Sequence, residues 1–162
     1  MTAHIPTSSA AVSPGLYLLV KLSGELYALP AMEVRELVRW TSCTRVPAAP
    51  QALRGVINLR GRVVPLFDLS ACLDTPTVEP GETSVVVVAQ RPHEAPAQAV
   101  AFLVEEVLET VRITAAQMET LEVSGAARDL TPCCATVGGR VLFLVSLDRL
   151  LTRLARAQGE AP

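Results

Sequence analysis

Short runs of aliphatic residues, broken by glycine, proline and polar residues, constrain the fold of this 162-residue chain more than any other feature. Runs such as residues 85–89 (VVVVA) stop far short of the ~20 apolar residues that a bilayer-spanning helix needs. Their length and β-branched content are typical of strands. Residues 16–22 and 26–29, on either side of a turn signal at 23–25, predict a β-hairpin. The chain is therefore expected to be mostly β.

Further strands are predicted along the rest of the chain, at 56–59, 63–67, 99–104 and 140–145. Arg60 and Gly61 supply a turn between the first two, because glycine tolerates positive φ at little cost. Pro65 confines its part of the strand to a sheet edge or a bulge. Many short strands with glycine and proline turns indicate a small-barrel architecture, and strand patterns that look alike on either side of 70–83 suit two small barrels sharing a core. No exact internal repeat is visible.

Two segments predict helices. Apolar residues at 32, 34, 37 and 38, after a proline at 30, indicate a short amphipathic helix, although the valines leave a strand open. Residues 147–157 repeat leucine every three or four positions, which predicts a C-terminal amphipathic helix with Ser146 as its N-cap. Residues 105–111 keep an apolar period, and 114–130 receive no firm assignment.

The length allows one ordinary domain or two very small ones. We expect residues 1–15 to be a disordered lead-in, 16–157 a single domain of two subdomains, and 158–162 a flexible tail. The start of the chain carries no targeting signal, so the protein is expected in the cytoplasm, with its four cysteines reduced. The cysteines are expected to be small apolar residues buried in the protein. Their spacing fits no zinc site.

Catalysis finds little support in the sequence. His4 falls in the lead-in and His93 in a proline-rich connection, and nothing brings either near a nucleophile. Glu105, Glu106 and Glu109 form an acidic run, for which a solvated face is favoured over a metal or proton-transfer site. A net charge of −2 leaves no basic footprint for nucleic acid. We therefore expect a protein without enzymatic activity, cofactor or metal.

The segment Asn58-Leu59-Arg60-Gly61-Arg62 places guanidinium groups at an exposed turn. One interpretation is a solvated hairpin tip. The other is an arginine anchor at a protein interface, where arginine is enriched among the residues that dominate binding. The residues alone do not decide between the two.

This region resembles the CheW family, the coupling proteins of bacterial chemosensory arrays. The family signature runs from a proline-rich loop, here at 47 and 50, into Gly-x-x-Asn-Leu-Arg-Gly at 55–61, followed by Pro65 and Asp68-Leu69. The opening segment with Val34 and Glu36, the AFLVEEVLETVRIT segment and the closing RVLFLVSLDRLL segment also resemble the family, so the likeness extends over 16–154.

The resemblance implies two small five-stranded β-barrel subdomains that share a hydrophobic core, followed by the C-terminal amphipathic helix. It also implies a non-enzymatic adaptor in the cytoplasm, at the periphery of membrane-bound receptor arrays. Its partners would be the helical tip of a chemoreceptor, the regulatory domain of a chemotaxis histidine kinase and, as a further candidate, other CheW-like domains. Neither nucleic acid binding nor direct membrane insertion is expected.

The resemblance also implies site residues. Glu36 and Arg60 match family positions near the receptor contact, and we add Asn58 and Arg62 of the same hairpin to that interface. Gly55 and Gly61 are expected as turn glycines. Apolar residues of the first barrel would meet the kinase, and the best matches are Val34, Val85, Val86, Val87 and Val88.

The chain departs from the family pattern at two places. Glu105 stands where the family usually has aspartate, and Pro132-Cys133-Cys134 replaces glycine and small apolar residues. Two alternatives therefore stay open. One is a degenerate family member in a motility-control system that binds receptor but not kinase, and the other is an unrelated small-barrel ligand-binding module.

Overall fold

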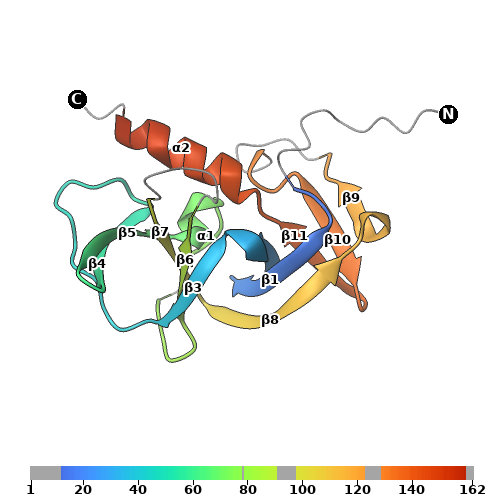
Figure 1. Cartoon of the computed structure of the whole chain (residues 1–162), viewed down its shortest axis with the longest axis horizontal. Helices are drawn as coiled ribbons and strands as arrows, with labels where there is room; N and C mark the ends of the chain where they lie inside the picture. Colours follow the sequence, from blue (N-terminus) through green and yellow to red (C-terminus); the bar gives the residue numbers. More distant parts are fainter. Residues whose placement is uncertain (1–11, 78, 91–97, 123–128, 160–162) are drawn as a thin grey trace.

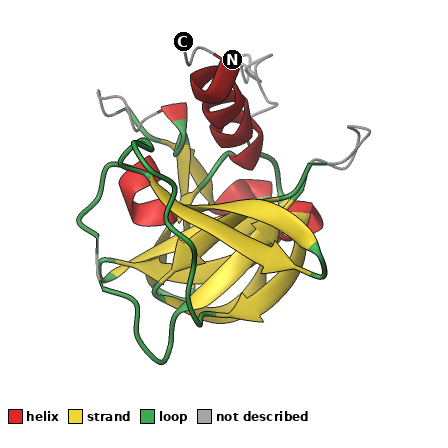
Figure 2. Cartoon of the chain, turned by 90° about the vertical axis from the view of Figure 1, so that its left-hand side faces the viewer, coloured by secondary structure: helices red, strands yellow, loops and turns green. Residues whose placement is uncertain are grey.

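The structure, a computed structural model, describes residues 12–77, 79–90, 98–122 and 129–159. About half of these residues lie in strands, and a long helix, α2, runs along one side of them (Figures 1 and 2). This confirms the predicted mostly β class with a C-terminal helix. In chain order the elements are β1 Gly15–Leu22, β2 Glu25–Pro30, the 3-10 helix η1 Ala31–Glu33, β3 Val34–Arg39, β4 Leu53–Leu59, β5 Arg62–Asp68, α1 Leu69–Cys72, β6 Val85–Ala89, β7 Val100–Val104, β8 Glu106–Ile113, η2 Ala115–Gln117, β9 Met118–Thr120, β10 Cys133–Val137, β11 Arg140–Leu144 and α2 Leu147–Gly159.

Within the described residues the strands form two sheets. The first sheet has six strands in the order β8-β1-β2-β11-β10-β9, and the second has five in the order β3-β6-β7-β5-β4. Each order begins and ends on different strands, so neither sheet is closed by backbone hydrogen bonds alone. Each contains one parallel pair, β2 with β11 and β5 with β7, beside antiparallel neighbours. The expected pair of subdomains is present, and the first has one strand more than expected.

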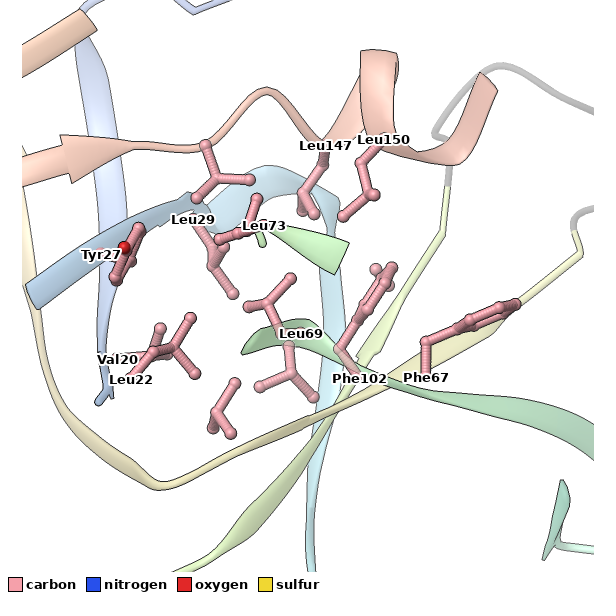
Figure 3. Close-up of a cluster of buried hydrophobic side chains, with 14 of the residues drawn as sticks. Val20, Leu22, Tyr27, Leu29, Phe67, Leu69, Leu73, Phe102, Leu147 and Leu150 are labelled. Carbon is pink, nitrogen blue, oxygen red and sulfur yellow. The ribbon is translucent and has the colours of Figure 1, made fainter. Parts of the chain in front are cut away.

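Three hydrophobic cores hold the sheets. A shared core lies between the sheets, where side chains from both sheets meet α1 and α2 (Figure 3). Each sheet also curls around a smaller core of its own. β1, β6 and β7 are buried on both faces, which explains their unbroken aliphatic runs. The shared core comprises Leu18, Val20, Leu22, Tyr27, Leu29, Phe67, Leu69, Leu73, Val87, Ala89, Phe102, Val104, Leu130, Val145, Leu147, Leu150 and Leu151; the first-sheet core Tyr17, Leu19, Ala28, Ile113, Ala135, Leu142 and Leu144; and the second-sheet core Val64, Leu66, Val86, Val88, Ala101 and Leu103.

The two sheets repeat one unit. The motif Glu-Val-x-Glu-x-Val-Arg occurs at 33–39, leading into β3, and again at 106–112 in β8, and each of these strands is the edge of its sheet. The sequence Gly-Arg-Val occurs at 61–63 and 139–141, where β5 and β11 begin. Each of those strands leads into a helix whose first leucine, Leu69 or Leu147, is fully buried. The longer match holds at five of seven positions and the shorter spans three residues, so the two units are alike without an exact repeat of sequence.

The repeat is not apparent along the sequence, because the strands of the two units follow one another in a different order. The hairpin β1–β2 takes, in the first sheet, the place that β6–β7 takes in the second. The boundary between the units consequently lies at Glu105, between β7 and β8. The segment 70–83, expected to separate two halves, instead begins inside α1 and ends before β6, within the unit of the second sheet.

Two other expectations change. The predicted helix after Pro30 is the single turn η1 followed by the edge strand β3, because Val34 and Val38 pack their branched side chains on the sheet. Residues 106–113 are likewise a strand. Pro65 lies in an interior strand, but it precedes 66–68, the part of β5 that pairs with β7, so no ladder bond is lost there.

At the N-terminal end Val12 packs against the first-sheet core, and the Ser13 carbonyl accepts a 2.6 Å hydrogen bond from the Tyr17 hydroxyl. Residues 1–11 of the expected lead-in and 160–162 of the expected tail lie outside the described residues, as do His4 and His93. No helix in the described ranges is long and apolar enough to cross a membrane.

The four cysteines are free thiols and are half-buried. Cys72 packs against the shared core, Cys43 against the second-sheet core and Cys133 against the first-sheet core. Burial, with a smaller contribution from the charge of Asp68, raises the pKa of the Cys72 thiol to about 12. This thiol therefore stays protonated at any physiological pH.

Native Cys72 should resist alkylation at pH 8. Only the thiolate reacts, and a pKa of about 12 leaves almost none of it. Labelling followed by peptide mass spectrometry should show Cys72 reacting slower in the native protein than in denaturant, by a factor on the order of a thousand. Equal rates in the two states would contradict the burial of this side chain.

Gly55 lies within β4 at a shift of register against β5, and not in a turn as expected. A Cβ at this position would stand 2.2 Å from the carbonyl oxygen of Thr44. That close approach is needed because Thr44 and Val56 exchange backbone hydrogen bonds of 2.8 and 2.9 Å. Glycine is thus required here for space.

Replacing Gly55 by alanine should lower the free energy of unfolding by about 1–3 kcal/mol, the usual cost of overpacking. Gly81→Ala is the matched control, since a Cβ there meets nothing within 4 Å. The control should change stability by less than ~0.5 kcal/mol. Urea denaturation of both variants provides the measurement, and equal stabilities would refute the steric role.

Candidate partner-binding surface

The turn between β4 and β5 is built by three residues. Arg60 and Gly61 have φ values of +53° and +84°, the left-handed pair that a two-residue hairpin turn requires. The side-chain oxygen of Asn58 accepts a 2.8 Å hydrogen bond from the Gly61 N–H. The described contact of Asn58 is therefore inside the turn, where it shapes the presentation of Arg60. Arg62 is exposed at the start of β5.

Arg60 and Glu36 form a two-pronged ion pair. The Arg60 guanidinium donates to the two carboxylate oxygens of Glu36 at 2.9 and 3.3 Å. The side chain of Glu36 is 20% exposed and that of Arg60 is 77% exposed, so the arginine keeps most of its surface free for another contact. The pair brings together the two residues that the family resemblance singles out.

The same pair shows how the second sheet curls. Glu36 lies on β3 and Arg60 follows β4, and these strands are the opposite edges of the sheet. The sheet must therefore roll round until its edges face one another. The backbone bridge between Thr44 and Val56 adds a second link across this opening. The second sheet is in this way closed by a side-chain pair and one short bridge.

The first sheet has an ion pair of its own, between its edge strand β8 and the interior strand β11. Arg140, at the start of β11, donates to Glu109 of the edge strand β8 at 2.6 Å. Glu109 stands at the position of Glu36 in the repeated motif. Glu109 is thus ion-paired rather than simply solvated, and in strand β8 the acidic run forms no helical face. Within the described residues, no group of three or more histidine, cysteine, aspartate or glutamate side chains could hold a metal ion.

Three exposed apolar side chains lie on η1, β3 and β5, whereas Glu36 of the ion pair lies opposite Val88 on the other face of β3. Met32 in η1 is 85% exposed, Leu37 on β3 is 46% exposed and Val63 on β5 is 71% exposed. Leu37 lies opposite Val87, and Val63 shares a strand face with Phe67, so both belong to the face that carries the shared core. We call Met32, Leu37 and Val63 the apolar margin. Sequence reasoning missed it as a surface, although reading β3 as a strand would have exposed Leu37.

The structure corrects the expected kinase surface. Val86, Val87 and Val88 are at most 2% exposed and point into the shared and second-sheet cores, so none of them can touch a partner in this fold. Their unbroken β-branched run reflects burial on both faces of β6. Val34 and Val85 are half-buried and pack against the shared core, Val34 on the edge strand β3 and Val85 at the start of the interior strand β6. Only these two of the five valines remain accessible.

Known proteins are similar to this chain in sequence. The family model described as CheW-like domain matches residues 16–155. The chemotaxis protein CheW of Rhizobium meliloti is 32% identical over 130 residues, which cover 79% of this chain and 81% of that protein. The chemotaxis protein CheW of Bacillus subtilis is 31% identical over 121 residues, covering 74% and 70%.

One further relative and one solved structure are also similar to this chain. Protein PilI of Pseudomonas aeruginosa is 29% identical over 75 residues, covering 46% of this chain and 42% of that protein. The crystal structure of the scaffolding protein TtCheW from Thermoanaerobacter tengcongensis matches with a TM-score of 0.75 and 23% identity, covering 85% of this chain and 92% of that one. The likeness to that structure is one of fold.

Proposed function

The chain belongs to the CheW-like domain family, and on that premise we propose that it is a non-enzymatic adaptor that couples chemoreceptors to a chemotaxis histidine kinase. It would act in the cytoplasm, at the periphery of membrane-bound receptor arrays. The observation that carries the proposal is the largely exposed Arg60, paired with Glu36, on a sheet that also carries the exposed apolar margin, because these residues combine the family's signature positions with exposed apolar surface.

For the receptor, we propose a contact over Met32 and Arg60. A chemoreceptor tip is helical, and an amphipathic helix binds by laying its apolar stripe on an apolar surface. Met32 offers an exposed, flexible side chain for such packing. Arg60, already oriented by Glu36, has donors left for a carboxylate or carbonyl of the helix. Arg62 is placed to extend the same polar contact.

For the kinase, we propose the edge strand β3. Its outer rim carries Leu37 and the accessible parts of Val34, with Val85 on the neighbouring strand β6. The regulatory domain of such a kinase would present a similar small barrel, and two barrel edges can meet through aliphatic side chains. A contact of modest area suits an array whose partners must rearrange.

Arg60→Glu should weaken binding of the cognate receptor's helical tip by about tenfold or more, because it replaces the exposed donor by a repelling charge. Arg140→Glu, which breaks the ion pair of the first sheet, is the matched control and should leave that affinity within about threefold. Isothermal titration calorimetry measures both.

A charge swap distinguishes a direct contact of Arg60 with the receptor from an indirect role of the Glu36–Arg60 ion pair. Glu36→Arg combined with Arg60→Glu restores an ion pair but not the arginine at the turn, so binding should stay weak. Full recovery in the swapped variant, or unchanged binding by Arg60→Glu, would rule out Arg60 as a receptor contact. Failure of the wild-type chain to bind the receptor tip would refute the receptor half of the function.

Leu37→Glu should weaken binding of the kinase regulatory domain by about tenfold, because a charge replaces an apolar contact at the centre of the interface. Leu108→Glu changes the same residue type at 42% exposure, on the repeated strand β8, and serves as control. Surface plasmon resonance with both variants gives the comparison. Equal affinities would remove β3 from the kinase interface, and a wild-type chain that binds receptor alone would be the degenerate coupler.

A further inference from the structure

The chain crosses between the two sheets at two places that correspond in the repeat. Between β2 and β3 it passes through the three residues of η1, and between β7 and β8 it passes through Glu105 alone. When the repeated motifs at 33–39 and 106–112 are aligned, Glu105 stands at the position of Met32. The same place in the unit therefore holds an exposed methionine in one crossover and a carboxylate in the other.

Glu105 ties together segments from both units. Its carboxylate accepts a hydrogen bond from the backbone N–H of Ser23, in the turn between β1 and β2 of the first sheet. Its own N–H donates to the Lys21 carbonyl of β1 at 3.2 Å. Its carbonyl accepts from the Thr83 hydroxyl, next to β6 of the second sheet, at 3.0 Å. A single residue thus contacts both sheets on either side of the boundary.

Ser23 extends this link. Its hydroxyl donates to the Pro76 carbonyl at 2.6 Å, in the segment between α1 and β6. Ser23 itself has a φ of +50°, so its N–H is aimed by a left-handed turn conformation. The carboxylate of Glu105 is the charged partner in the cluster, and a hydrogen bond to a charged acceptor is stronger than one between neutral groups.

In the crossover between β2 and β3, the matching position holds Met32, whose side chain has no carboxylate to accept such a hydrogen bond. Met32 is 85% exposed, and the contacts of this crossover include a 3.0 Å backbone hydrogen bond from the Gln90 N–H to the Glu33 carbonyl. One crossover is therefore fixed by a carboxylate, and the other leaves its side chain on the surface. The smaller core of each sheet resists deformation, so an adjustment between the sheets has to occur as a movement of whole units against the shared core.

We propose that Glu105 is a positioning residue that sets the orientation of the two sheets relative to each other. By holding the β1–β2 turn against the boundary, it fixes where the first sheet stands beside Met32 and β3. The consequence for receptor binding rests on the proposed function, whereas the orientation itself does not.

Residual dipolar couplings of the labelled full-length chain test the orientation directly. Glu105→Ala should rotate one sheet relative to the other while couplings within each sheet still fit the wild-type structure. Glu105→Gln keeps an oxygen acceptor for the Ser23 N–H and should retain the wild-type orientation. Glu106→Gln removes a charge one residue further on and is the matched control. Unchanged orientation in Glu105→Ala would overturn the proposal.

Glu105→Asp covers the case in which the alanine variant does not fold. The aspartate carboxylate is one methylene shorter, so it should pull the β1–β2 turn toward the boundary or lose the Ser23 bond, and in either case the couplings between sheets should shift. Wild-type couplings in this variant, with the Ser23 amide exchanging faster with solvent, would overturn the proposal, because the tie would be broken without effect.

Binding of the cognate receptor tip provides the second arm. Glu105→Ala should weaken it by about fivefold or more, and Glu105→Gln should restore it to within about twofold. A wild-type chain that does not bind the tip refutes the proposed function, while the couplings still decide the role of Glu105. A rotated Glu105→Ala variant with wild-type affinity would overturn the link between orientation and binding.

Discussion

The double burial of three strands is the constraint on which the rest of this structure depends. β1, β6 and β7 each place one face in the shared core and the other in the core of their own sheet. A strand used in this way must be apolar at nearly every position, which leaves little of it for recognition. The surface left for contact with other proteins consequently lies at the edges and turns, where β3 and the β4–β5 hairpin carry exposed charges and aliphatic side chains.

Much of the fold could be predicted because local rules and tertiary packing agree. The hairpin 16–29, the strands around Arg60 and Gly61 and the leucine-rich last helix all follow from turn chemistry and periodicity. The segment after Pro30 was predicted as a helix because its apolar residues are spaced by three or four. The bulge in β3 between Val34 and Glu36 shifts the alternation of this strand by one residue and so hides the strand pattern. The repeat was hidden by its permuted order.

The site could be predicted in part. Likeness to a family pointed to Glu36 and Arg60, but no local pattern shows that these residues touch, since their strands lie at opposite edges of a curled sheet. Asn58 has a local explanation in the turn, which its spacing from Gly61 could have indicated. The valines of β6 were assigned to an interface because a continuous apolar run does not distinguish a buried strand from an exposed one.

The permuted repeat also governs the order in which the molecule can assemble during synthesis. All strands of the second sheet are complete once Val104 has been made, so this half can fold early from contacts among neighbours in the chain. The hairpin β1–β2 emerges first, yet its partners β8 and β11 come near the other end. β1 and β2 therefore stay without their neighbouring strands until β8 and β11 have been made, and pairing over such a separation in sequence is slow. The N-terminal hairpin thus keeps its apolar faces without their sheet partners until that point.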